Sequence, residues 1–227
     1  WKTFLTCEEN SDKNYGARDK KTGKMGTTRG KWESFYPHPI EHYQWVVEID
    51  PETGKSQKHT NLGRFGHESS TCHTSKSGKV VVYSADDKAG EHIYKFVSEN
   101  NTDFKKGVLY AADTINGKWL PLDLELSPIL KKHFKTHLDV MINAREASKI
   151  LGATPLNRPE DIEVHPHTGE VYIALTKNPK LGDYHGQILK ISESDNNHAG
   201  TSFNASSFVM GGLTAGFACP DNLAFDI

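Results

Sequence analysis

The sequence predicts an all-β fold with a small helical insertion. Short apolar runs bounded by turn-forming residues recur along the chain, and one stretch alone repeats its apolar residues at helical spacing. The predicted strands cover residues 1–7, 43–49, 92–97, 107–112, 187–191 and 207–210. Many short strands of this kind favour a β-propeller, a sandwich or a barrel.

Three further segments have the pattern of β-hairpins. In residues 50–55, 75–83 and 167–175, a turn that contains glycine accompanies an alternating apolar run. The turns recur without a strict period, so they indicate similar blade-like units and not a number of repeats.

The helical insertion is predicted at about residues 127–151. Ser127 and Pro128 can cap and start a helix, and Gly152 offers a C-terminal stop. The apolar residues at helical spacing are Ile129, Leu130, Phe134, Leu138, Met141 and Ile142. We expect one or two helices here, and covering a core is their ordinary role.

Composition excludes several function classes. The chain of 227 residues carries 27 basic and 29 acidic side chains, a balance that predicts no nucleic-acid partner. We expect no membrane insertion, because no window approaches the length of a membrane span. Its three cysteines lack a C-x-x-C pair, so neither a disulfide framework nor a zinc knuckle is indicated. Both ends lie within predicted strands, so we expect a piece of a longer protein.

The motif LTCEEN, residues 5–10, places a soft thiolate beside hard carboxylates. Cys7 suits iron, zinc or copper, whereas Glu8 and Glu9 suit calcium, magnesium or manganese, so the motif could serve two different ions. A buried structural cysteine followed by solvated glutamates is the alternative.

A second acidic constellation combines GRFGHES, residues 63–69, with the pair Asp86 and Asp87 at a strand end. Neighbouring carboxylates repel each other unless a cation or a base compensates them. An exposed Asp-Asp turn is the alternative interpretation.

Two later motifs combine carboxylates with other polar groups. In residues 157–163, Arg158 offers a planar fork for two phosphate oxygens beside Glu160, which could hold a metal. A salt bridge between Arg158 and Glu160 is the alternative. In residues 217–225, Asp221 and Asn222 place oxygen donors at the entrance of a predicted inner strand, or form an Asx turn.

The motifs together resemble PhoX-type alkaline phosphatases. LTCEEN, GRFGHES, VVVYSADD, IYKFVS, NAREASKILGATPLNRPEDIEVHP with TGEVYIALT, and FACPDNLAFD follow one another in the family's order, and residues 143–176 are the most specific. The resemblance implies a six-bladed β-propeller, of which residues 1–227 would be a partial, single domain. It also implies a cluster of Fe3+ and Ca2+ that cleaves small-molecule phosphate monoesters in a periplasmic or secreted protein, a monomer when complete.

The resemblance also implies roles for individual residues. Arg158, Cys7 and Glu160 would be catalytic, with Arg158 binding the substrate phosphate. The implied metal ligands are Cys7 for iron and, in the same cluster, Glu8, Glu68, Glu160 and Asp221, with Asp86 and Asp87 as further candidates. Glu9, His67, Asp161 and Asn222 would orient these ligands.

Two other functions remain open on the sequence alone. The same acidic loops could bind calcium structurally in a propeller that serves as a non-catalytic binding module. A propeller hydrolase of the sugar-lactonase kind, with one calcium, is less favoured because calcium prefers oxygen ligands to the Cys7 thiolate.

Overall fold

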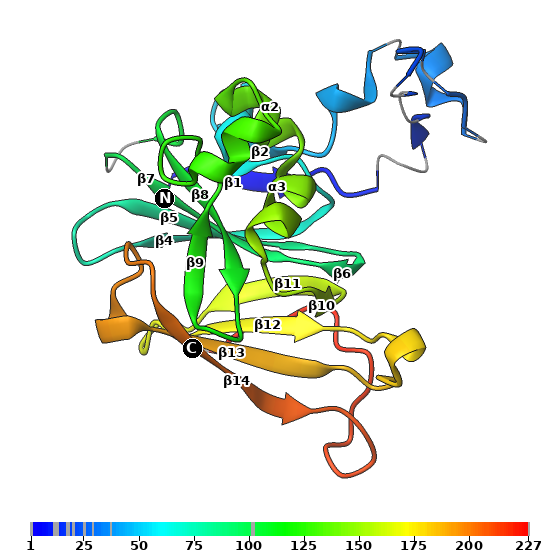
Figure 1. Ribbon diagram of the computed structural model, residues 1–227. Helices are drawn as coiled ribbons and strands as arrows, with labels where there is room; N and C mark the ends of the chain where they lie inside the picture. Colours follow the sequence, from blue (N-terminus) through cyan, green and yellow to red (C-terminus); the bar gives the residue numbers. More distant parts are fainter. Residues whose placement is uncertain are drawn as a thin grey trace.

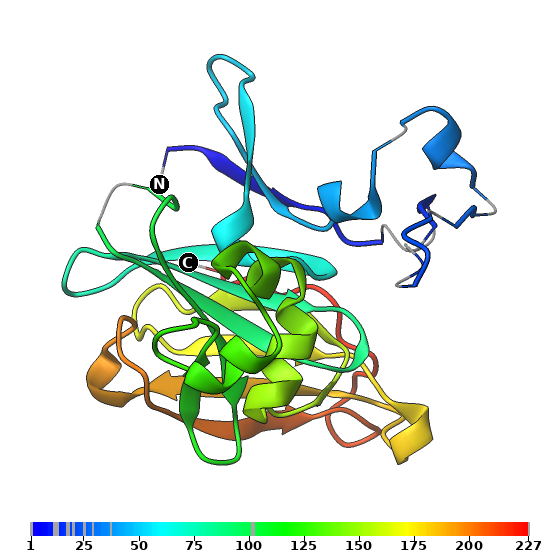
Figure 2. The ribbon, with the colours of Figure 1, turned by 45° about the horizontal axis from the view of Figure 1, so that its top comes forward.

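The computed structural model describes residues 2–10, 14–16, 19, 21–24, 26–28, 30–36, 38–100 and 103–226. Antiparallel sheets dominate it, and residues 137–151 carry two short α-helices (Figures 1 and 2). The all-β prediction with a small helical insertion is therefore confirmed. Among the described residues, no helix is both long and apolar enough to cross a membrane.

Three sheets of three or more strands make up the fold, and in each the strands pair with neighbours in chain order. The first contains β1 (Phe4–Cys7), β2 (Val46–Ile49) and β3 (Ser56–His59). The second contains β4 (His67–Thr74), β5 (Val80–Asp86), β7 (Ile93–Ser98), β8 (Gly107–Asp113) and β9 (Lys118–Pro121). The third contains β11 (Pro159–Val164), β12 (Val171–Leu175), β13 (Gln187–Glu193) and β14 (Phe203–Met210). The short strands β6 (Ala89–Glu91) and β10 (Leu156–Asn157) pair separately.

Antiparallel sheets whose strands follow chain order are typical of propeller blades. The sheets formed by the described residues do not close into a ring. The number of blades therefore stays a prediction, as does the assignment of residues 1–227 to one propeller-type domain.

The five-stranded sheet is central because both of its faces are covered. Strand β5 is buried along its whole length, and its side chains alternate between two apolar clusters. Val80 and Val82 join the cluster beneath the helices, whereas Val81, Tyr83 and Ala85 join the cluster shared with the four-stranded sheet. The first strands of the three sheets adjoin each other, because β4 contacts both β1 and β11.

The helical insertion covers one face of the central sheet (Figure 2). It contains the 3-10 helix η4 (Pro128–Lys132), α2 (His137–Ile142) and α3 (Ala144–Leu151). Ser127 and Pro128 start the 3-10 turn, while Thr136 forms a capping box with Asp139 for α2. Gly152 ends α3 at a φ of 84°, as its position in the sequence indicates.

The three predicted hairpins are confirmed, but one expected strand is absent and several observed strands were not predicted, among them β3, β4, β9 and β11. Strands β4 and β11 are rich in polar and acidic side chains and lack the apolar alternation of ordinary strands. Residues 218–226 were expected to enter an inner strand, yet they form none. They are joined to β11 instead through Asp161, whose Oδ2 accepts a hydrogen bond from the Leu223 amide at 2.8 Å.

A buried ion pair connects the central sheet to the four-stranded sheet. Lys95 on β7 and Glu193 at the end of β13 lie 2.9 Å apart, with both side chains fully buried. Tyr83 and Trp119 also donate hydrogen bonds to Glu193, at 2.6 and 3.1 Å. Burial lowers the pKa of Lys95 to about 8, although the Glu193 carboxylate favours its charged form.

Candidate metal and phosphate site

Five carboxylates that are far apart in the sequence meet beside the first strands of the sheets. They form two groups, Glu9 with Glu68 and Asp87, and Glu68 with Glu160 and Asp221. Within each group, one oxygen from every residue lies within 4.8 Å of the others. Glu68 belongs to both groups, so we refer to the five residues together as the carboxylate cluster.

Backbone irregularities direct the central members of the cluster. The pairing of β4 with β5 shifts register between His67 and Ser70, around Glu68. The pairing of β11 with β12 shifts between Pro159 and Ile162, around Glu160. Such β-bulges bend a strand locally and re-aim a side chain, and they are over-represented next to active sites. Glu68 and Glu160 can therefore point to one place from two neighbouring sheets.

Burial and the repulsion of neighbouring carboxylates raise the pKa of two members of the cluster, Glu68 and Glu160. Burial raises the pKa of Glu68 to about 7, and the charges of Glu9 and Asp87 add to the effect. Burial also raises the pKa of Glu160 to about 7, although hydrogen bonding from Thr176 acts in the opposite direction. Carboxylates held this close favour a cation that compensates their charge.

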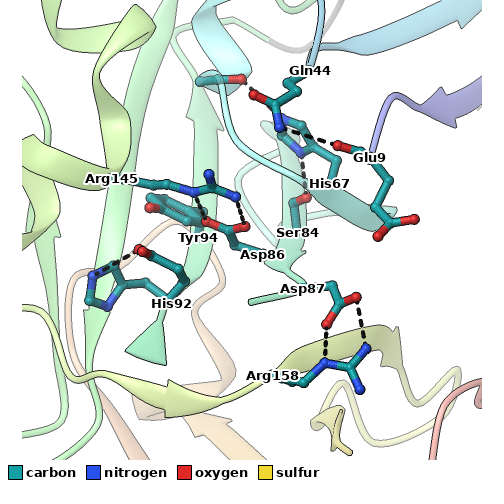
Figure 3. Close-up of polar contacts among 12 residues, drawn as sticks. Glu9, Gln44, His67, Ser84, Asp86, Asp87, His92, Tyr94, Arg145 and Arg158 are labelled. Atoms are coloured by element: carbon teal, nitrogen blue, oxygen red, sulfur yellow. Dashed lines mark hydrogen bonds and ion pairs between the residues drawn. The ribbon is translucent and has the colours of Figure 1, made fainter. Parts of the chain in front are cut away.

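Arg158 lies against the cluster and is held by two of its members. Its Nε and Nη2 donate to the two oxygens of Asp87 at 2.8 and 2.9 Å (Figure 3). Its Nη2 also lies 2.7 Å from Glu160 Oε1. Its φ of 53° falls in the left-handed region, which is uncommon for residues other than glycine. The structure thus contains the salt bridge between Arg158 and Glu160 that the sequence offered as an alternative.

A cavity of about 340 Å³ opens beside Arg158. Glu9, Asp87 and Arg158 line it together with Arg145, a residue to which the sequence analysis assigned no role. Arg145 on α3 donates to both oxygens of the fully buried Asp86, at 2.7 and 2.6 Å (Figure 3). This pair anchors the end of β5 immediately before Asp87. No local pattern could reveal it, because the two partners are 59 residues apart.

Cys7 lies near the cluster but outside both carboxylate groups. The side chain packs against the apolar cluster beneath the helices. Burial raises the pKa of its thiol to about 11; a hydrogen bond with Ser70 lowers the pKa, and the charge of Glu68 raises it further. The sulfur therefore stays protonated at neutral pH unless a positive ion stabilises the thiolate.

Two other predicted ligands are engaged elsewhere in the structure. Glu8 lies 2.7 Å from the Lys58 ammonium and accepts a hydrogen bond from the Trp45 amide at 3.1 Å. Asp86 is held by Arg145, as described above, and neither residue belongs to a carboxylate group. Glu9, predicted only to orient the ligands, occupies a position in the cluster instead.

The other residues predicted to orient ligands differ in their surroundings. Asp161 fixes the segment that carries Asp221, since it accepts from the Leu223 amide and its own amide bonds the Asp221 carbonyl at 3.3 Å. His67 is fully buried and bonds Ser84 and the Gly63 carbonyl, at 2.8 and 2.9 Å. Asn222 is exposed.

The residues present fit hard cations. Oxygen donors from several carboxylates are the preferred ligands of calcium, and a neighbouring thiol adds a donor suited to iron. Glu68 could contribute to two adjacent ions because it belongs to both groups. A guanidinium next to such ions is suited to an anionic ligand with several oxygens, such as phosphate.

Comparison with known proteins gives a consistent result. The family described as Alkaline phosphatase PhoX matches residues 1–227. A solved structure of Pseudomonas fluorescens PhoX, in complex with vanadate, a transition state analogue, is 29% identical with a TM-score of 0.86. The similarity covers 100% of this chain and 52% of the Pseudomonas chain. Comparison with curated proteins found no match. With the family matched over its whole length, the chain belongs to the PhoX alkaline phosphatases.

Proposed function

We propose that this chain carries the metal-binding and phosphate-binding part of an enzyme that hydrolyses phosphate monoesters with a cluster of iron and calcium ions. The observation that carries the proposal is the sharing of Glu68 between two carboxylate groups, directly beside the Arg158 guanidinium. Family membership and the vanadate complex of the Pseudomonas protein support it. Export to the periplasm or the medium and a monomeric whole protein belong to the same proposal.

Each residue has a defined part in this function. Glu9, Glu68, Asp87, Glu160 and Asp221 would hold calcium, with Cys7 as the thiolate ligand of iron. Glu8 and Asp86 would join them only after leaving Lys58 and Arg145. When bound, the ions would supply positive charge for phosphate oxygens and for the charge that develops in the transition state.

Arg158 would bind the substrate phosphate, and its neighbours prepare it for that task. Asp87 and Glu160 hold the guanidinium in one orientation at the cavity, so little side-chain entropy is lost when an ester binds. Arg145 acts indirectly, because its pair with Asp86 fixes the chain next to Asp87.

Metal analysis of the whole purified protein tests the proposed cluster. We expect iron together with calcium, and we expect Cys7→Ser to lose iron while it retains calcium, because serine keeps the size of the side chain and removes the thiolate. Calcium alone, with no hydrolysis of phosphate esters, would instead support a non-catalytic binding module.

Arg158→Lys tests the phosphate-binding role. Lysine keeps the charge but loses the planar fork, so kcat/KM for a phosphate monoester should fall about a hundredfold. Inhibition by inorganic phosphate should weaken in parallel, while the metal content stays unchanged. An unaltered kcat/KM would refute the assignment of this residue.

A further inference from the structure

A second cavity adjoins the phosphate site and has a different character. Its volume is about 240 Å³, and it shares Glu9 and Asn10 with the cavity beside Arg158. Its other lining residues are Glu8, Asn14, Tyr15, Trp32 and Tyr43. We refer to this cavity as the aromatic pocket. Its lining residues follow β1 or belong to the segment that leads to β2, and Figure 1 shows described parts of that segment extending away from the sheets.

Three aromatic rings line the pocket, and they differ in how far they are exposed. Tyr15 is buried and stacks on Tyr43, with centroids 3.9 Å apart and an interplanar angle of 17°. Trp32 meets Tyr15 edge to face at 6.4 Å, yet 47% of Trp32 is exposed. The two tyrosines therefore form a fixed wall, and the indole remains accessible to a planar ligand.

Hydrogen bonds connect the two parts of this segment that line the pocket. The Thr28 amide donates to Glu33, next to Trp32, at 2.9 Å. The Thr28 hydroxyl donates to the Asn14 carbonyl at 2.8 Å. The indole and the Asn14 backbone are thus held in relation to each other before a ligand enters.

The charges of the pocket restrict what it can accept. Glu8 is compensated by Lys58 at 2.7 Å, whereas Glu9 belongs to the carboxylate cluster. The two carboxylates of the lining would repel a second anionic group of the ligand, so an uncharged group fits better. The amides of Asn10 and Asn14 can donate to and accept from the edge of such a group.

We propose that the aromatic pocket receives the organic half of the phosphate ester and favours a planar, uncharged aromatic group, as in aryl or nucleoside monophosphates. The inference rests on the proposed function, because the phosphate must lie beside Arg158. Trp32 is then a specificity-determining residue. The two cavities are neighbours, since Glu9 and Asn10 line both, so the organic half of an ester bound at Arg158 would lie on the side of the aromatic pocket.

Adenosine 5′-monophosphate and ribose 5-phosphate test this in the whole protein, since their leaving alcohols are alike and they differ by the base. The unaltered protein should prefer the nucleotide in kcat/KM by about tenfold, the size of one base–aromatic stack. Trp32→Ala should remove most of that preference and change ribose 5-phosphate less than twofold, while Trp32→Phe should retain part of it. Phe35→Ala is the control, because Phe35 is 77% exposed and lies outside the pocket lining.

Two outcomes would overturn the inference. In the first, Trp32→Ala lowers kcat/KM equally for both esters, which indicates a structural role. In the second, the unaltered protein shows no preference for the nucleotide. Calorimetric measurement of the binding of both esters distinguishes failure of this inference from failure of the proposed function. If hydrolysis is absent but the nucleotide still binds more tightly in a Trp32-dependent way, the phosphatase function is contradicted and the role of the aromatic pocket is supported. If both esters bind equally, the role of the aromatic pocket is contradicted.

Discussion

Replacing Glu68 by glutamine in the whole protein should lower phosphatase kcat by about a thousandfold, the equivalent of roughly 4 kcal/mol of transition-state stabilisation. Glutamine preserves the shape of the side chain and removes its charge. Because Glu68 belongs to both carboxylate groups, one substitution weakens both proposed ion sites at once. Steady-state kinetics and calcium titration measure the two consequences independently.

Glu163→Gln is the matched control for this substitution. Glu163 lies on β11 with Glu160 and is partly buried, but it belongs to neither carboxylate group. The control should keep its activity and calcium stoichiometry, and both variants should unfold at similar temperatures. Full activity in the Glu68 variant would show that the shared carboxylate has no part in catalysis.

Replacing Lys95 by methionine should lower the free energy of unfolding by about 3–5 kcal/mol, the range observed when one partner of a buried ion pair is removed. The ammonium lies 2.9 Å from Glu193 and also donates to the Gly200 carbonyl at 2.8 Å. Methionine leaves Glu193 buried with Tyr83 and Trp119 as donors but without a compensating charge. Denaturant titration of the whole protein gives the difference.

Lys190→Met provides the comparison, because Lys190 lies on β13, the strand that also carries Glu193. Its ion pair with Glu170 is equally short, 2.7 Å, but both side chains are partly exposed, so its loss should cost less than about 1 kcal/mol. Adding Glu193→Gln to the Lys95 variant should restore part of the stability, because it removes the unpaired charge. An equal loss of unfolding free energy in the two lysine variants would contradict the claim that burial makes the Lys95–Glu193 pair more important for stability.

Much of the secondary structure could be predicted from local patterns. The strand at Val171–Leu175 and the hairpin turns at Gly54, Gly78 and Gly169 follow from apolar alternation and turn residues. Strands β4 and β11 escaped because their polar side chains hide the strand period, and these are the two strands that carry Glu68 and Glu160. The apolar alternation that predicts a strand is therefore weak where a strand carries polar side chains for a functional site inside the fold.

The sequence predicted which types of residue form the candidate site better than it predicted how they are arranged. The acidic motifs and Arg158 stand out in the sequence, yet nothing local distinguishes Glu9 from Glu8. The structure directs Glu8 to Lys58 and places Glu9 in the cluster. The Arg145–Asp86 pair was similarly invisible, because its partners come from a helix and a strand far apart in the chain.

Hydrogen bonding and burial within a few residues suffice to specify turns, strands, helix ends and the chemistry that each motif offers. The meeting of five carboxylates around one guanidinium depends on the packing of β1, β4 and β11 and on the bulges in two of them. Those contacts join residues separated by tens of positions, and their geometry arises when the sheets bury their shared faces.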